Sequence, residues 1–187
     1  MRRARPALVV LALALAGCGV MRVEGQPDPA EIPSGPLAAM SDDAVGPVTE
    51  VGSGRTLGIG WRYAIYDTAD GVCTQLELAS VASGSCGSLP LIPEESVFGG
   101  VGSGGAGGDP GAPLESPTPI DGIVSSRVAA VWIETASAGR IAATLLPLAG
   151  AGHDATAFVG FVPAGETATG VVATDAEGEL LETFDLP

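Results

Sequence analysis

The sequence predicts an all-β protein whose main domain is an antiparallel β-sandwich, and three observations support this. Short apolar runs recur at intervals of roughly 8–12 residues and are separated by turn-forming residues. The chain is rich in such residues, with 28 Gly and 15 Pro among 187 residues. After the N-terminal segments, no stretch shows a long apolar helical stripe with capping residues. We therefore expect one β-sandwich domain over residues 47–187, which is long enough to bury a core.

The N-terminus has the layout of an export signal. Residues 1–6 are short and basic, and Ala7–Ala16 is an unbroken apolar run. A membrane-spanning helix needs about 20 apolar residues, so this shorter run fits the helical core of a signal peptide. An ordinary secretory signal and an uncleaved anchor are the alternatives.

The apolar run ends in Leu15-Ala16-Gly17-Cys18, which resembles the lipobox of bacterial lipoproteins. This resemblance implies that residues 1–17 are a lipoprotein signal peptide and that Cys18 carries the lipid after cleavage. Two or three acyl chains anchor a protein stably, whereas a single chain holds it only marginally. The resemblance therefore implies a protein bound to the membrane through lipid on Cys18, at the extracytoplasmic face of the cell membrane.

Residues 18–46 show no sustained periodicity. The segment contains Pro, Gly and scattered acidic residues, and it lacks the apolar pattern of a strand or a helix. This composition is typical of a solvated chain. We expect a flexible, disordered tether that carries the domain away from the membrane or through a wall layer.

The domain begins with a predicted β-hairpin. Residues 56–66 alternate, with Trp61, Tyr63 and Ile65 on one face and the residues between them on the other. Residues 67–71 (DTADG) have turn chemistry, and residues 72–79 resume the alternation. Another short strand is expected over residues 97–101.

Residues 99–119 form a low-complexity tract in which Gly comes first and Pro later. The composition predicts a flexible Gly/Pro-rich loop inside the single domain. A linker between two small modules is the alternative. We favour the loop because neither flank alone has enough large apolar residues for a core.

The C-terminal third contains a weak internal repeat in which each copy reads strand, strand, Gly turn, strand. The copies are offset by about 38–40 residues. Their strands and turns begin at Gly122, Val131 and Gly139 in one copy, and at Gly160, Val171 and Gly178 in the other. Because a solenoid needs at least about three repeats, two copies favour paired hairpins that face each other in a sandwich.

Four short segments carry a second resemblance: Trp61-Arg62, Val72-Cys73, Ser85-Cys86-Gly87 and the strand pair that closes at the Gly178 turn. Together they resemble uncharacterised secreted proteins of actinobacterial type with immunoglobulin-like modules. The resemblance spans about residues 55–187 and implies an immunoglobulin-like sandwich. It implies no known activity.

Cys73 and Cys86 are the two cysteines that remain once Cys18 is assigned to the lipid. Disulfides persist outside the cytoplasm, and this spacing would close a loop of about 14 residues. We expect a disulfide that joins the end of the hairpin to the following loop. Two free buried thiols, or a metal-binding or catalytic thiol, are the alternatives.

No set of residues predicts a catalytic site, a metal site or a cofactor. His153 is the only histidine and lies in a small-residue turn, and no Ser occupies a Gly-x-Ser-x-Gly elbow. We therefore expect an exposed turn histidine, which with two spare cysteines makes no zinc set. The match Gly100-x-Gly102-x-x-Gly105 opens no helix, so we interpret it as a chance occurrence in a Gly-rich tract.

Two further groups of residues have a structural interpretation. Residues 175–179 (DAEGE) depart from the spacing of a calcium loop and predict a solvated acidic turn. Trp61, Tyr63 and Trp132 are expected in the core rather than on a ligand platform. Acidic residues are plentiful, so a pair of carboxylates that performs acid–base catalysis is an alternative interpretation.

The charge of the chain restricts its partners. All eight basic residues are Arg, and three of them lie in the predicted signal, whereas all 22 acidic residues follow it. A strongly acidic mature chain argues against binding to nucleic acid and against electrostatic docking on anionic lipid. We expect a non-catalytic interaction or envelope-associated module, with an envelope protein as a possible partner. The alternatives are a hydrolase with an unrecognised carboxylate site and an extracytoplasmic sensor or accessory subunit of a complex.

Overall fold

The computed structural model describes residues 30–40, 44–79, 82–103 and 116–186. The predicted signal peptide, Cys18 and the first part of the predicted tether lie outside the described residues, as does the middle of the Gly/Pro-rich tract. The described chain forms β-strands and one short 3-10 turn. These are β1 (Thr49–Thr56), β2 (Ile59–Asp67), β3 (Gly71–Leu78), β4 (Ala82–Ser88), β5 (Phe98–Ser103), β6 (Thr118–Ser125), β7 (Ala130–Thr135), β8 (Gly139–Ala142), β9 (Thr144–Pro147), η1 (Ala149–Ala151), β10 (Ala155–Val162), β11 (Ala168–Thr174) and β12 (Leu180–Asp185).

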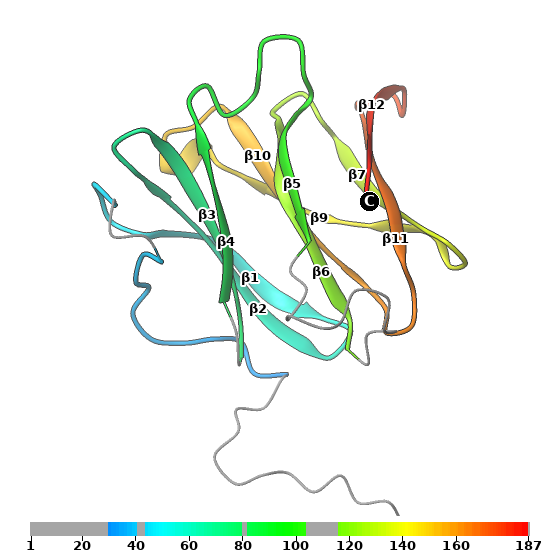
Figure 1. The fold of residues 1–187 in the computed structure, drawn as a ribbon, viewed down its shortest axis with the longest axis horizontal. Coiled ribbons are helices and arrows are strands. Elements are labelled where there is room, and N and C mark those ends of the chain that lie inside the picture. The colour runs from blue at the N-terminus through cyan, green and yellow to red at the C-terminus, as the bar shows by residue number, and fades with distance from the viewer. Residues whose placement is uncertain (1–29, 41–43, 80–81, 104–115, 187) are drawn as a thin grey trace, which may run out of the picture.

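The strands form three antiparallel sheets that stack as layers (Figure 1). Sheet I has the strand order β1-β2-β3-β4, sheet II has β5-β6-β10-β9, and sheet III has β12-β11-β7-β8. The predicted all-β antiparallel sandwich is therefore confirmed. The immunoglobulin-like detail is not confirmed, because an immunoglobulin domain has two sheets whereas the described residues form three.

Sheet II is the middle layer and separates two cores. Every residue of its central strand β10 is buried. Phe161 on one face of β10 packs with Trp61 and other apolar side chains of sheet I. Phe158 on the opposite face packs with Ile133 and other apolar side chains of sheet III. A strand that is covered on both faces reads as a nearly continuous apolar run rather than an alternating one, and in β10 the one polar residue is Thr156.

The weak sequence repeat is a structural duplication. Strands β5–β8 form one copy and β9–β12 the other, and each copy gives one hairpin to sheet II and one to sheet III. The copies meet symmetrically where β6 pairs with β10. The pairing of Gly122 with Phe158 maps onto that of Ile120 with Gly160 when the repeat offset is applied. Strands β7 and β11 pair in the same manner, so the predicted hairpins face each other about a local twofold axis.

The predicted strand over residues 56–66 is wrong in its extent. Strand β1 ends at Thr56 and β2 begins at Ile59, and the two strands are joined by a two-residue turn. Leu57 and Gly58 in this turn have φ values of 51° and 77°. Positive φ at both positions suits the tight turns that join antiparallel strands. The apolar alternation continued through the turn and concealed it.

Two other predictions about the first half are resolved. The hairpin turn at residues 67–71 is confirmed, since β2 and β3 pair across it and Thr68 N donates to Gly71 O. The Gly/Pro-rich loop is shorter than residues 99–119, because β5 extends to Ser103 and β6 begins at Thr118. Gly100 and Gly102 of the Gly-x-Gly match therefore lie in a strand, and Gly105 lies outside the described residues.

Candidate functional site

Residues 30–40, which the sequence placed in a solvated tether, lie across the outer face of sheet I. We call these residues the strap. Gly60 makes room for it, because the Glu31 carbonyl oxygen occupies the space that a Cβ atom on Gly60 would fill. Toward the other end of the strap, Met40 Sδ lies 3.4 Å from the corresponding position at Gly84, which is an ordinary contact distance. Gly60 belongs to β2 and Gly84 to β4, so the strap crosses the sheet.

Beyond the strap the chain contacts sheet I again. Ala44 forms an isolated antiparallel bridge with Thr68, and Val45 N donates to Asp67 O over 3.0 Å. The contacts of the folded unit therefore begin before residue 47. The physical reason is that the side chains of β2 are buried on both faces, so the outer face also requires a cover.

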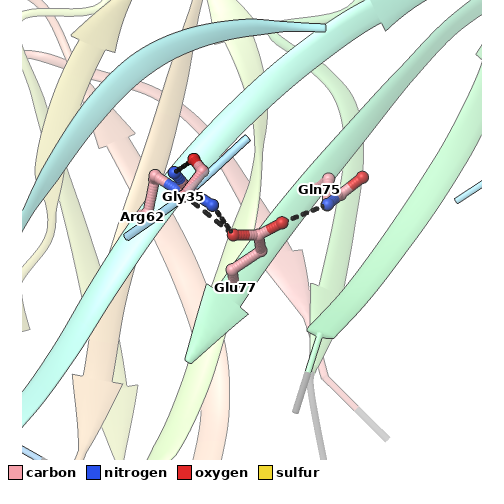
Figure 2. A network of polar contacts seen from close by, with 4 residues as sticks. All are labelled: Gly35, Arg62, Gln75 and Glu77. Atoms are coloured by element: carbon pink, nitrogen blue, oxygen red, sulfur yellow. Dashed lines mark hydrogen bonds and ion pairs between the residues drawn. The ribbon is translucent and has the colours of Figure 1, made fainter. Parts of the chain in front are cut away.

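An ion pair ties the strap to the sheet. Arg62 and Glu77 lie opposite each other on β2 and β3, and the Arg62 side chain is only 8% exposed. Arg62 Nε donates to Glu77 Oε2 over 2.9 Å, and Nη2 donates to the same oxygen. Arg62 Nη1 donates to the carbonyl oxygen of Gly35 in the strap over 2.9 Å (Figure 2). Each guanidinium nitrogen thus has an acceptor, which offsets the cost of burying the charge.

Gln75 extends this network along the same face of β3. Its Nε2 donates to Glu77 Oε1 over 2.6 Å, and the residue is 2% exposed (Figure 2). Its Oε1 is buried and has no hydrogen-bond partner among the described residues. A buried acceptor without a donor costs about 1–3 kcal/mol. The network therefore lacks one hydrogen-bond donor, the one that Gln75 Oε1 would accept from.

A shallow pocket of ≈ 250 Å³ lies beside the ion pair. It is lined by Glu31, Ile32, Pro33, Ser34, Arg62, Glu77 and Ala79. One wall belongs to the strap and the other to sheet I, and the guanidinium is already engaged by Glu77 and Gly35. This junction joins the folded domain to the segment that leads toward Cys18, and we treat it as the candidate functional site.

A second buried polar contact joins sheets I and II. Tyr63 Oη on β2 donates to Asp121 Oδ2 on β6 over 3.2 Å. Burial raises the pKa of the Asp121 carboxyl from 3.8 to about 6, while the Tyr63 hydrogen bond acts in the opposite direction. Burial, followed by the nearby Asp121 charge, raises the pKa of the Tyr63 hydroxyl well above its usual value. Asp121 lines neither the pocket beside the ion pair nor the surface pockets at Asp70 and at His153.

The predicted disulfide is confirmed. Cys73 on β3 and Cys86 on β4 lie directly opposite each other and are bonded. Cys73 is buried, whereas Cys86 on the edge strand is exposed. The expected loop after the hairpin is instead the edge strand β4, because residues 82–88 pair with β3, so the bond joins two neighbouring strands of the sheet. Cys18, the predicted lipidation site, lies outside the described residues.

His153 is more buried than the expected exposed turn histidine. It follows η1 in the predicted turn, but its side chain is only 17% exposed. Its Nε2 lies 3.2 Å from Asp67 Oδ1 at the end of β2. The exposure was mispredicted because the partner lies in a different sheet and is remote in the sequence. The pair joins one end of sheet I to the loop that precedes β10.

The aromatic prediction is correct in part. Trp61 and Tyr63 are buried in the core between sheets I and II. Trp132 is only half-buried, because its neighbours Val131 and Ile133 point into the core and alternation directs Trp132 to the outer face of sheet III. The acidic turn at 175–179 is confirmed, with Asp175 Oδ1 accepting from the backbone N–H groups of Glu177 and Glu179.

The described residues contain no group of three or more His, Cys, Asp or Glu side chains that would hold a metal ion. Within the same residues, no helix has the length and apolar character needed to cross a membrane. Comparison with known proteins finds no matching family model, no matching curated protein and no matching solved structure.

Proposed function

We propose that the protein is a lipoprotein of the extracytoplasmic membrane face that presents a β-sandwich as a non-catalytic interaction or envelope-associated module. The disulfide between Cys73 and Cys86 carries this proposal, because such bonds persist outside the reducing cytoplasm. Of the three cysteines in the chain, it leaves Cys18 for a lipid. The acidic mature chain gives no electrostatic attraction to anionic lipid, so the lipid on Cys18 supplies the membrane attachment.

The candidate site supports the proposal through its position. The strap connects the segment that follows Cys18 to the outer face of sheet I, and Arg62 holds it there by its bond to Gly35. Arg62 and Glu77 are paired with each other, and Gln75 Nε2 donates to Glu77, so these groups make a structural junction.

Labelling with a fatty acid tests the anchor. We expect the wild-type protein to incorporate the label and to fractionate with membranes, and the Cys18→Ser variant to lose both properties. Cys86→Ser serves as the matched control, because it removes a cysteine and the disulfide but leaves Cys18 in place. Equal incorporation in wild type and Cys18→Ser would contradict the proposal.

A hydrolase with a carboxylate site is the second candidate, and one observation favours it. Asp121 is a buried carboxyl whose pKa is raised to about 6, as in many general acids. Its burial between two sheets disfavours access by a substrate. Turnover of any substrate in a hydrolase panel that is lost in Asp121→Asn would favour this candidate over the module.

A further inference from the structure

We propose that the strap is a clamp that sets how far the domain stands from its membrane anchor. This inference rests on the proposed lipid on Cys18, and it adds a function to the segment between anchor and domain. The strap is held at three places along its length: Glu31 contacts Gly60, Gly35 accepts from Arg62, and Met40 lies over Gly84.

The contacts of the strap are specific although none of its residues belongs to a strand. The close approach of the Glu31 backbone to β2 requires that residue 60 has no side chain. Ile32, Pro33 and Leu37 are half-buried, which adds apolar contact to the hydrogen bond from Arg62. A segment that is not paired as a strand can leave the sheet while the sheet itself stays folded.

The covalent length of the chain limits how far the domain can lie from Cys18, both when the strap is attached and when it is detached. Between Cys18 and Glu31 the backbone spans at most about 45 Å, whatever its conformation, because each residue adds about 3.3–3.6 Å. If the strap detaches, the free segment extends to the bridge at Ala44 and its limit rises to about 90 Å. For a flexible chain, the root-mean-square spans are about 20 Å and 30 Å, respectively. The attached strap thus holds the domain close to the bilayer.

Gly60→Ala is the variant that releases the clamp. Its added methyl group would overlap the Glu31 carbonyl and the start of the Ile32 backbone, so the strap must move. Gly87→Ala is the matched control on the same sheet, because no atom lies within 4 Å of the position of its Cβ. A second variant, with residues 31–40 replaced by a Gly-Ser segment of equal length, releases the strap without changing the sheet.

The experiment measures the height of the protein above a bilayer. Mature chains of residues 18–187, with the disulfide oxidised, are coupled through the Cys18 thiol to a maleimide phospholipid in a supported bilayer and measured by neutron reflectometry. We expect the protein layer of Gly60→Ala and of the Gly-Ser variant to move outward by about 10 Å relative to wild type and Gly87→Ala, as the two flexible spans differ by that amount.

Proteolysis in solution reports on the strap independently of any anchor. A protease that cleaves after glutamate should cut the Glu31–Ile32 bond about tenfold faster in Gly60→Ala than in wild type or Gly87→Ala, because cleavage requires local release of the backbone. Two results together would overturn the clamp: equal cleavage rates in wild type and Gly60→Ala, and equal layer heights for wild type and the Gly-Ser variant. Since the lipid is attached chemically, this result is separate from failure of the proposed function, which would appear as an unmodified Cys18 in cells.

Discussion

Tyr63 on β2 donates a buried hydrogen bond to Asp121 on β6, and this contact links sheet I to sheet II. Asp121 pairs with Val159, which occupies the equivalent position in the second copy of the duplication. Near the symmetry axis, on the face that meets Tyr63, one copy therefore has an acidic residue where the other has the apolar Val159. This buried carboxyl makes the stability of the domain depend on pH.

Asp121→Asn should remove a pH dependence of stability between about pH 4 and pH 7. The folded-state pKa of about 6 lies above the usual 3.8, so the folded protein binds this proton more tightly than the unfolded chain does. The contribution of Asp121 is fully present below pH 3.8 and is lost as the pH rises through 6. The loss amounts to about 3 kcal/mol at most. Urea denaturation at several pH values measures the free energy of unfolding.

The exposed Asp185 provides the control for that series. Asp185→Asn should keep the wild-type change in unfolding free energy between pH 4 and pH 7, because this carboxyl is not buried in a core. At pH 7.5 we expect Asp121→Asn to be more stable than wild type, because the amide retains an acceptor for Tyr63 and carries no charge. A wild-type pH profile that persists in Asp121→Asn would show that other groups cause it.

Tyr63→Phe should destabilise the domain by about 1–3 kcal/mol, because it leaves a buried carboxyl without its donor. The Tyr63 hydrogen bond lowers the pKa of Asp121, so its removal should raise that pKa further. NMR titration of the Asp121 carboxyl carbon measures the change. A pKa that falls or stays constant in Tyr63→Phe would disprove the coupling between the two side chains.

Gly122 and Gly160 are equivalent in the duplication but should respond differently to Ala. A Cβ on Gly122 would overlap the Gly100 carbonyl on the neighbouring strand and crowd the Phe158 ring, whereas one on Gly160 would meet the flexible end of Ile133. Overpacking costs about 1–3 kcal/mol, and we expect Gly122→Ala at or above the upper end and Gly160→Ala near the lower. Thermal denaturation of both variants checks the order, and equal losses would contradict it.

The Cys73–Cys86 disulfide should stabilise the domain by about 3 kcal/mol, since it closes a short loop in the unfolded chain. Replacement of both cysteines by Ser should lower the urea midpoint by a corresponding amount. Reduction of the wild-type protein should have the same effect, and the double variant should not respond to reductant. A wild-type midpoint that is unchanged by reductant would contradict this prediction.

The sequence predicted those parts of the fold that depend on local pattern. The hairpin turn at residues 67–71, the disulfide and the C-terminal repeat all follow from spacing and turn chemistry, and the structure confirms them. The arrangement in three layers could not be predicted, because the sequence of a buried strand such as β10 is apolar whichever sheets cover it. Trp132 was misplaced for a related reason, since composition does not tell which face of a strand meets solvent.

The candidate site could have been predicted only in part. The turn at residues 67–71 fixes the register of β2 and β3, and that register places Arg62 opposite Glu77. The cross-strand pair was therefore accessible from the sequence. The strap was not, because its contact depends on the missing side chain of Gly60, and a glycine in a strand equally often marks a bulge or a tight bend.

The central claim is the lipid on Cys18, and the intact mass of the protein isolated from its own cell envelope tests it most directly. We predict a chain that begins at Cys18, carries a diacylglyceryl group on that residue, and is lighter by two hydrogens for the Cys73–Cys86 disulfide. A mass that matches a chain with an unmodified Cys18, or one that retains residues 1–17, would contradict the account.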